Sequence, residues 1–281
     1  MELLTGKTKT PEKNLIKKNL YNGKINFLIG THALFQKAIV FNKLGLAIID
    51  EQHKFGVRQR IQLSNKGGSN CDILLMSATP IPRTLIMTAY GDMDVSRIIK
   101  KPINRKSIIT LSKPEEKIEE IIHYIQKQIN DGKQVYWVCP LIEESKNLDY
   151  AAAVKKFKFL SKKFNFKVGL IHGALDKKSK NNVLKEFLKK KIDILVSTTV
   201  IEVGIDFPNA NVIVIENSNK FGLSQLHQLR GRVGRGNIQG TCILLYKKNL
   251  SENAKRRIKI LKSSNDGFYI AEEDMKLKGI W

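Results

Sequence analysis

The stretch LGLAIIDEQH, residues 44–53, decides the fold class of this chain. Its first six residues are almost continuously apolar, without the alternation that a strand with one solvated face would show. Such a run predicts a strand covered on both faces, as in the parallel sheets of α/β proteins. The acidic pair Asp50 and Glu51 follows directly, at the end of the strand where ligands of open α/β sheets gather.

Seven further apolar runs occur along the chain, with amphipathic segments between them that predict helices, for example at residues 114–130 and 177–190. Three runs precede a charged, proline-containing stretch at residues 100–107 and five follow it, so two sheets joined by a linker are expected. The expected fold is therefore α/β with two parallel-sheet lobes. The runs are KINFLIG (24–30), LGLAIID (44–50), CDILLMSAT (71–79), QVYWVCP (134–140), KVGLIHG (167–173), IDILVSTT (192–199), NVIVIEN (211–217) and TCILLYK (241–247).

Composition points to a polyanionic partner. Lys and Arg total 49 against 26 Asp and Glu, a net charge of +23, which favours nucleic acid, although the lysine runs also fit a Lys-rich codon bias. The three cysteines are far apart in apolar runs and are expected to be buried, reduced thiols. No signal peptide or bilayer-length apolar stretch is found, so no membrane insertion and a cytoplasmic location are expected.

Residues Gly6, Lys7 and Thr8 match the end of a phosphate-binding P-loop. The first glycine of that motif would fall at Met1, with no strand before it, so we interpret these residues as a flexible basic turn. No other stretch of the sequence fits the motif. Together with the small number of runs before residue 100, this predicts an incomplete first lobe whose missing strands lie upstream.

Polar residues follow two runs of the first lobe. Asp50 could hold Mg²⁺ through water beside phosphates, and Glu51 could orient and deprotonate an attacking water. The alternative is an Asp that caps the next helix. Ser77 and Thr79 could donate to phosphate oxygens or to the acidic pair, or could form an ordinary turn before a helix.

The second lobe has its own polar residues beyond the run at 192–199, and an arginine-rich stretch, QLHQLRGRVGRG, at 225–236. Guanidinium groups suit the spread charge of a transferring phosphoryl group. Arginines inserted from a facing domain are worth roughly 10³ to 10⁵ in rate. The alternative is the solvated, basic end of a helix. The glycines between the arginines argue against this alternative. The arginines are Arg230, Arg232 and Arg235.

Four stretches, in this order, resemble motifs II, III, V and VI of the superfamily two helicases: DEQH (50–53), SATP (77–80), TTVIEVGID (198–206) and QLRGRVGR (228–235). Within that class the sequence is similar to the RecG family. The stretches that carry this closer resemblance are GTHALFQ (30–36), DEQHKFGVRQR (50–60), SATPIPRTL (77–85), FGLSQLHQLRGRVGRG (221–236) and NDGFYIAEEDMKLKG (265–279).

The resemblance implies two RecA-like lobes, with ATP and Mg²⁺ in the cleft and DNA lying across both. It implies a monomeric motor that acts on branched, single-stranded or double-stranded DNA in recombination and repair. The C-terminal part of lobe one, with motifs II and III, is expected at 1–104, lobe two at 105–250, and part of a translocation helical hairpin at 251–281.

The resemblance also implies residue roles. Asp50 would hold Mg²⁺, Glu51 would be the catalytic base, and Arg235 is the first choice for the arginine finger. The other residues expected at the nucleotide or linking it to lobe two are Gln52, His53, Gly204, Asp206, Gln228 and Arg232. Those expected to couple hydrolysis to movement or to contact DNA are Ser77, Thr79, Thr31, His172, Thr198 and Thr199.

Two departures from the family matter. The Walker A region and the N-terminal wedge domain of the family are absent, and the family pattern after KLKG does not continue. The chain alone is therefore expected to hydrolyse ATP negligibly. One alternative is the motor of a transcription-repair coupling factor, whose motif II usually reads DEEH, so Gln52 favours RecG. Another is a non-catalytic basic nucleic-acid-binding remnant.

Overall fold

The structure is a computed structural model that describes residues 1–51, 65–67, 71–77, 94–98, 106–140, 146–198, 207–234, 236 and 238–279. The chain divides into two compact units, Met1–Ala78 (unit 1) and Thr79–Trp281 (unit 2). Each unit is described here by itself. Much of the expected linker at 100–107 lies outside the described residues, so the expected domain boundaries stay a prediction.

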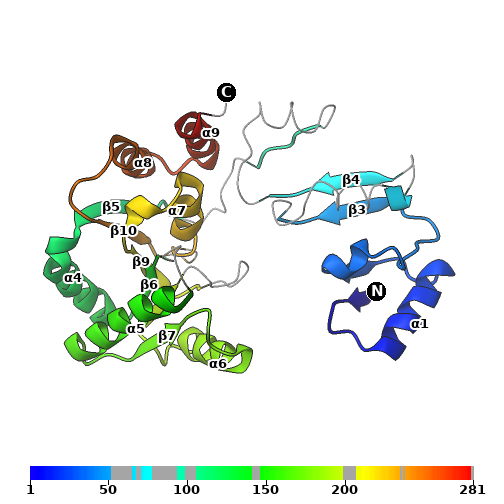
Figure 1. Cartoon of the computed structure of the whole chain (residues 1–281), viewed down its shortest axis with the longest axis horizontal. Coiled ribbons are helices and arrows are strands. Elements are labelled where there is room, and N and C mark those ends of the chain that lie inside the picture. The colour runs from blue at the N-terminus through cyan, green and yellow to red at the C-terminus, as the bar shows by residue number, and fades with distance from the viewer. Residues whose placement is uncertain are drawn as a thin grey trace. The chain divides into compact units, whose positions relative to one another are not determined.

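Unit 1 contains two small parallel sheets (Figure 1). β1 (Glu2–Leu4) pairs with β2 (Leu28–Gly30), and β3 (Leu46–Ile49) pairs with β4 (Asp72–Leu75). The helix α1 (Thr10–Tyr21) packs on the first sheet, and the short helix η1 (His32–Phe35) follows β2. The buried residues of this first core are Leu4, Ile16, Leu20, Ala33 and Ile39.

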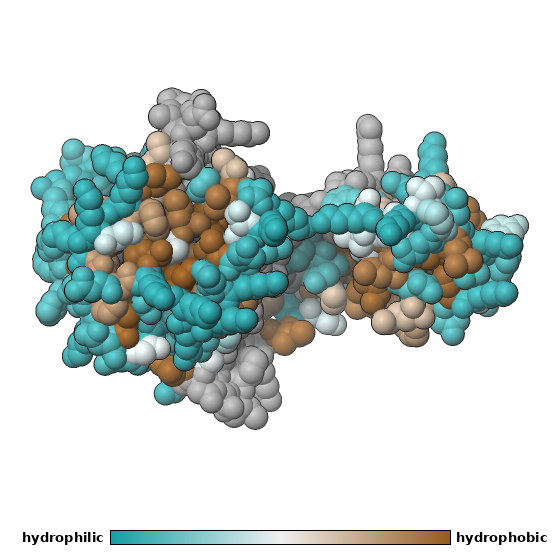
Figure 2. Space-filling model, turned by 90° about the horizontal axis from the view of Figure 1, so that it is seen from below, coloured by the Kyte–Doolittle hydropathy of each residue, from teal (hydrophilic) through white to brown (hydrophobic). Residues whose placement is uncertain are grey.

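Each sheet of unit 1 also exposes apolar side chains on alternate strand positions. Leu3 and Ile29 are register partners and are 58% and 54% exposed, while their neighbour Leu4 is fully buried. Ile48 and Leu74 form a similar exposed pair on the second sheet. Figure 2 shows brown apolar side chains reaching the surface of this unit. The strands are therefore apolar on both faces, the pattern of parallel sheets that are covered on both sides.

Unit 2 is built on a six-stranded sheet with the order β5-β10-β9-β6-β8-β7, in which all neighbouring strands are parallel. Because the strands are parallel, all their carboxyl ends lie at one edge of the sheet. The chain leaves β6 toward β7 and β8 on one side and later adds β9 and β10 on the other. The strands are β5 (Ile109–Pro114), β6 (Gln134–Cys139), β7 (Val168–Ile171), β8 (Ile194–Thr198), β9 (Ala210–Ile215) and β10 (Thr241–Tyr246).

Helices cover both faces of this sheet. The helices α4 (Ile118–Asn130) and α5 (Lys146–Lys163) pack on one face, over Val135, Trp137 and Cys139 of β6. On the other face, α6 (Lys177–Leu188), α7 (Leu223–Arg230) and α8 (Glu252–Ser263) pack over Tyr136 and Val138 (Figure 1). Consecutive residues of β6 thus enter different cores, and all six are buried, as the apolar run predicts.

The chain ends in a helical hairpin formed by α8 and α9 (Gly267–Lys278). The hydroxyl of Ser251 accepts a hydrogen bond from Ala254 N at 3.3 Å and begins α8, and Asp266 accepts from Phe268 N at 2.8 Å and begins α9. Gly279, with φ of 66°, ends α9. Side-chain N-caps and a left-handed C-terminal glycine are the sequence signals that separate these two helices.

All eight predicted apolar runs contain a strand, which confirms the α/β prediction. Two strands, β1 and β5, were not predicted. The helix predicted from residue 114 begins later, at Ile118, because Pro114 ends β5 and a short helix, η4 (Glu115–Lys117), precedes α4. Cys139 and Cys242 are buried as expected, whereas Cys71 is only half-buried. In the part of the chain that the structure describes, no helix has the length and apolarity needed to cross a membrane.

Candidate functional site

The carboxyl edge of the β3–β4 sheet carries Asp50, Glu51 and Ser77. Asp50 and Glu51 directly follow β3, and Ser77 lies two residues beyond β4. Ile49 and Leu75 are register partners, and Met76 N donates to Ile49 O at 2.8 Å, so the strands end side by side. The structure therefore brings the acidic pair and Ser77 to one edge of one sheet, where ligands of parallel sheets bind.

Glu51 has an unusual backbone for a glutamate. Its φ is 51°, in the left-handed region, and its backbone N–H donates to the adjacent Asp50 Oδ1 at 2.8 Å. One carboxylate oxygen of Glu51, Oε2, is buried, whereas Asp50 is exposed. Non-glycine residues in this region cost roughly 1 to 3 kcal/mol and cluster at functional sites.

Asp50 offers the donor type that Mg²⁺ prefers, an exposed carboxylate at a strand end. Among the described residues there is no group of three or more His, Cys, Asp or Glu side chains that could hold a metal by themselves. A magnesium ion held by Asp50 would thus take its remaining ligands from water and phosphate oxygens, as Mg²⁺ in nucleotide sites commonly does. The donor set fits that use of the metal.

Thr31 and the Gly6–Lys7–Thr8 stretch lie at the carboxyl edge of the β1–β2 sheet. Thr31 is exposed, and its carbonyl accepts from Leu34 N at 3.0 Å at the start of η1. Thr8 Oγ1 accepts from Thr5 N at 2.9 Å, which closes the turn between β1 and α1. The strand β1, which was not predicted, leads into this turn; it begins at Glu2, after the position of the motif's first glycine, so the interpretation of Gly6, Lys7 and Thr8 as a turn stands.

Thr198 and His172 lie at the carboxyl edge of unit 2, where β8 and β7 end. Thr198 is 1% exposed, and its Oγ1 is buried and has no hydrogen-bond partner among the described residues. His172 directly follows β7 and is 6% exposed. Because Ile171 pairs with Ser197 in the register of β7 and β8, the two residues that follow this pair lie at the same edge.

We expect His172 to make unit 2 less stable in mild acid. Burial first, and the charge of Lys180 second, lower the pKa of His172 from its ordinary value of 6.5. The unfolded chain therefore takes up the proton at a higher pH than the folded chain does, so the stability contributed by neutral His172 is present above about pH 6.5 and is lost as the pH falls through the lowered pKa. Urea unfolding at about pH 7.5 and about pH 5.5 measures this loss.

The variant His172→Gln should show a smaller loss of stability between these two pH values, and the exposed-histidine control His123→Gln should behave as the parent does. An unchanged pH dependence in His172→Gln would contradict the assignment.

Gln228 and Arg232 lie on and just after α7, and both are half-buried. Burial raises the pKa of Tyr136 to about 12, while its hydrogen bond with Ser197 and the charge of Arg232 oppose that rise. The hydroxyl of Ser197 donates to Tyr136 Oη at 2.9 Å. The positive charge of Arg232 therefore acts on the Tyr136 hydroxyl, which meets Ser197 near the carboxyl end of β8.

Arg230 has a different place from the one suggested by its sequence neighbours. It is 2% exposed, and its Nη1 donates to Leu261 O at 2.6 Å, Ser264 O at 2.9 Å and Thr110 Oγ1 at 3.3 Å. All these acceptors belong to the protein, on β5 and at the end of α8. We therefore correct the reading of Arg230 as a phosphate ligand and assign it to the packing of the hairpin against α7.

A second contact between α7 and the hairpin was not anticipated from the sequence. The hydroxyl of Ser224 donates to Asp274 Oδ2, and Lys278 Nζ donates to the same oxygen at 2.9 Å. Asp274 is 5% exposed, so this carboxylate is buried between its two partners. The four-residue spacing of Asp274 and Lys278 on α9 was the available signal, since such pairs face each other on a helix.

The remaining predicted site residues lie outside the described residues. They are Gln52, His53, Thr79, Thr199, Gly204, Asp206 and Arg235.

Two protein-family models match the chain. The model described as DEAD/DEAH box helicase matches residues 1–88, and the model described as helicase conserved C-terminal domain matches residues 116–237. The strand-end placement of Asp50, Glu51 and Ser77 in the first region, and of Thr198 in the second, fits this pair of matches. The chain belongs to the superfamily two helicases.

Within this class the chain belongs to the RecG family. It is 49% identical over 279 residues to ATP-dependent DNA helicase RecG of Thermotoga maritima and 48% identical over 281 residues to that of a Synechocystis species, in each case over 99% of this chain. It covers 36% and 34% of those two relatives, so it spans about a third of their length.

A solved structure of RecG bound to a three-way DNA junction is similar to 99% of this chain, with 46% identity and a TM-score of 0.76, and the match covers 36% of that protein. The two lobes are therefore RecA-like, as the resemblance implied.

Proposed function

We propose that this chain supplies the motor region of an ATP-dependent DNA helicase that remodels branched DNA. The observation that carries the proposal is identity of 45 to 49% with RecG proteins over almost the whole chain, together with an acidic pair at the carboxyl edge of β3. A RecG structure contains a three-way DNA junction, which supports branched DNA as the substrate class. We infer a monomeric motor that acts on single-stranded or double-stranded DNA in the cytoplasm, in recombination and repair.

At the nucleotide, Asp50 would hold Mg²⁺ through water, and that ion would neutralise phosphate charge when bound. Glu51 would orient and deprotonate the attacking water. Its carboxylate lies at the strand end and can accept a proton from that water. Gln52 and His53 would link this edge to lobe two. The residues proposed to meet the nucleotide from lobe two are Gly204, Asp206, Gln228, Arg232 and Arg235.

For DNA, we propose that hydroxyl and imidazole groups at the strand ends meet the backbone or couple hydrolysis to movement. Thr31 and His172 lie at such ends in units 1 and 2, which supports their assignment. The full set is Thr31, Ser77, Thr79, His172, Thr198 and Thr199. We further propose that residues 1–104 belong to lobe one, 105–250 to lobe two and 251–281 to the hairpin.

The 281-residue chain alone is expected to hydrolyse ATP negligibly, because no stretch within it fits GxxxxGK[ST]. The test therefore uses an exchange protein, the Thermotoga maritima relative in which the aligned 279 residues are replaced by those of this chain. DNA-stimulated ATP hydrolysis by the exchange protein supports the proposal, and its loss by at least about 10³-fold in Glu51→Gln would assign the base. The control is Glu186→Gln, an exposed carboxylate on α6.

Appreciable DNA-stimulated hydrolysis by the 281-residue chain itself would overturn the expectation of inactivity. Inactivity of a folded exchange protein, with DNA binding that is steeply salt-dependent and indifferent to branch structure and to ATP analogues, would instead support a non-catalytic basic remnant.

A further inference from the structure

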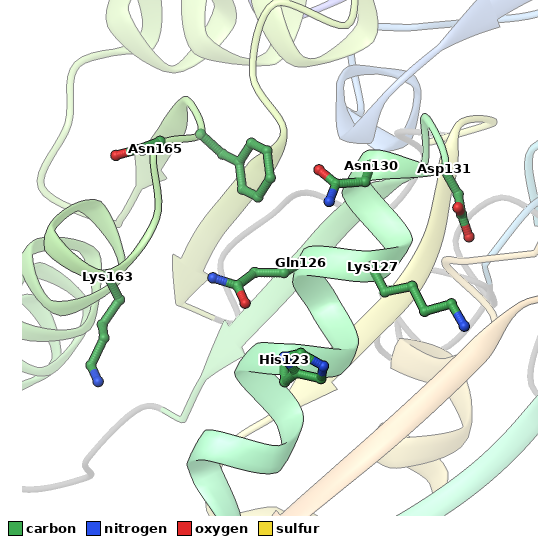
Figure 3. Close-up of a pocket in the computed structure, with 8 residues that line it drawn as sticks. His123, Gln126, Lys127, Asn130, Asp131, Lys163 and Asn165 are labelled. Atoms are coloured by element: carbon green, nitrogen blue, oxygen red, sulfur yellow. The ribbon is translucent and has the colours of Figure 1, made fainter.

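A groove of about 480 Å³ lies between the C-terminal end of α4 and the segment that joins α5 to β7 (Figure 3). Its volume is within the range of roughly 300 to 1,000 Å³ that is typical of small-molecule sites. We call it the α4–α5 groove. The lining residues used below are His123, Gln126, Asn130, Lys163, Asn165 and Phe166.

The groove is separate from the candidate motor site. Asn130 ends α4 just before β6 begins at Gln134, and Asn165 and Phe166 precede β7, which begins at Val168. These residues therefore lie at the amino-end edge of the sheet, opposite the carboxyl edge that carries His172 and Thr198.

One side of the groove is a polar stripe on α4. His123, Gln126 and Asn130 are spaced by three and four residues and so share one side of the helix. The opposite side of α4 is apolar, since Ile121, Ile122, Ile125 and Ile129 are buried in the core. In Figure 3 the amides of Gln126 and Asn130 point from α4 toward the side that carries Lys163 and Asn165. Side-chain amides offer an adjacent donor and acceptor, the arrangement that pairs with adenine.

The other side supplies an aromatic ring and a cation. Phe166 is half-buried, packs against the core under α4 and α5, and lies 5.8 Å from Phe164, centroid to centroid. A ring fixed in this way can stack on an unpaired base without having to be ordered first. Lys163 Nζ lies 2.9 Å from Glu119 Oε1 in an exposed ion pair, which costs little to exchange for a phosphate contact.

We propose that the α4–α5 groove binds an unstacked adenine base of a single DNA strand. The base stacks on Phe166, its edge is paired by the amides of Gln126 and Asn130, and Lys163 contacts a neighbouring phosphate. An aromatic ring beside side-chain amides and a lysine is the chemistry of single-strand base recognition. The proposal does not rest on ATP hydrolysis.

Equilibrium binding of fluorescein-labelled oligodeoxyadenylate and oligothymidylate of equal length to the 281-residue chain tests this proposal, at several salt concentrations. We expect tighter binding of the adenine strand, and a fivefold to tenfold loss of its affinity, roughly, in Phe166→Leu, which keeps an apolar side chain in the core. Asn130→Ala and Gln126→Ala should remove the preference for adenine over thymine. Lys163→Ala should weaken the binding of both oligonucleotides and lower the salt dependence of their affinity.

Matched controls are Gln128→Ala and Lys162→Ala, which remove an amide from α4 and a lysine from α5 outside the groove. Gln128 accepts from Lys133 Nζ at 2.8 Å on another side of the helix. An azidoadenine-containing strand should photocrosslink to residues 123–131 or 163–167. Equal affinity for both strands in the parent, groove variants that match their controls, or crosslinks confined to other segments would each overturn the proposal.

Discussion

Arg232→Ala in the exchange protein is expected to lower DNA-stimulated ATP hydrolysis by about 10³-fold. Arg232 lies two residues beyond α7, is half-buried, and its charge acts on Tyr136 of β6, whose hydroxyl accepts from Ser197 near the carboxyl end of β8. A guanidinium held at that edge can stabilise charge that develops on transferring phosphoryl oxygens, and this stabilisation acts in the transition state. Steady-state hydrolysis with saturating DNA measures the loss in kcat.

Arg232→Lys should recover little of this activity, because an ammonium group lacks the planar fork that contacts two oxygens. Lys189→Ala, which removes an exposed positive charge after α6, is the control and should leave kcat within about twofold. Arg235→Ala should behave as Arg232→Ala does if the two arginines share the phosphates. A kcat for Arg232→Ala equal to that of the control would remove Arg232 from the proposed site.

Arg230→Ala is expected to destabilise unit 2 by about 3 kcal/mol. The substitution leaves the carbonyls of Leu261 and Ser264 without the donor that now lies 2.6 Å and 2.9 Å away, respectively. It also opens space around a side chain that is among the largest fully buried ones in the described structure. Each unsatisfied buried acceptor costs roughly 1 to 3 kcal/mol, and packing losses add to this.

Urea unfolding followed by the fluorescence of Trp137, which is fully buried in the same unit, measures the change in a Trp281→Phe background. Arg256→Ala is the control, because the Arg256 side chain is 55% exposed and its ion pair with Glu273 spans 3.3 Å. That control should lose less than about 1 kcal/mol. Equal losses in the two variants would show that Arg230 does not hold the hairpin in place.

The central strands could be predicted from the sequence, because burial on both faces leaves near-continuous apolar runs such as QVYWVCP. The strand β5 was not predicted, because it lies at the edge of its sheet, mixes Thr110, Ser112 and Lys113 with apolar residues, and ends at Pro114. Edge strands tolerate polar residues and proline, so they carry little of this signal. The strand β1 was not predicted, because it has only three residues.

The candidate site was predictable in its order along the chain but not in its contacts. Asp50, Ser77, His172 and Thr198 could be assigned to strand ends because each is a polar residue near the end of an apolar run. The role of Arg230 was not predictable, because its partners lie 31, 34 and 120 residues away in sequence. A short run of arginines has the same pattern whether a given member faces a ligand or the protein interior.

The left-handed backbone of Glu51 constrains which substitutions position 51 can accept. Glycine or asparagine would adopt that φ of 51° more cheaply than glutamate does. A sequence selected only for folding stability would therefore be more stable with one of those residues in place of Glu51. Glutamate at this position therefore lowers the conformational stability of unit 1 but keeps the carboxylate that we propose as the catalytic base. A substitution by glycine or asparagine would relax the turn and remove that carboxylate.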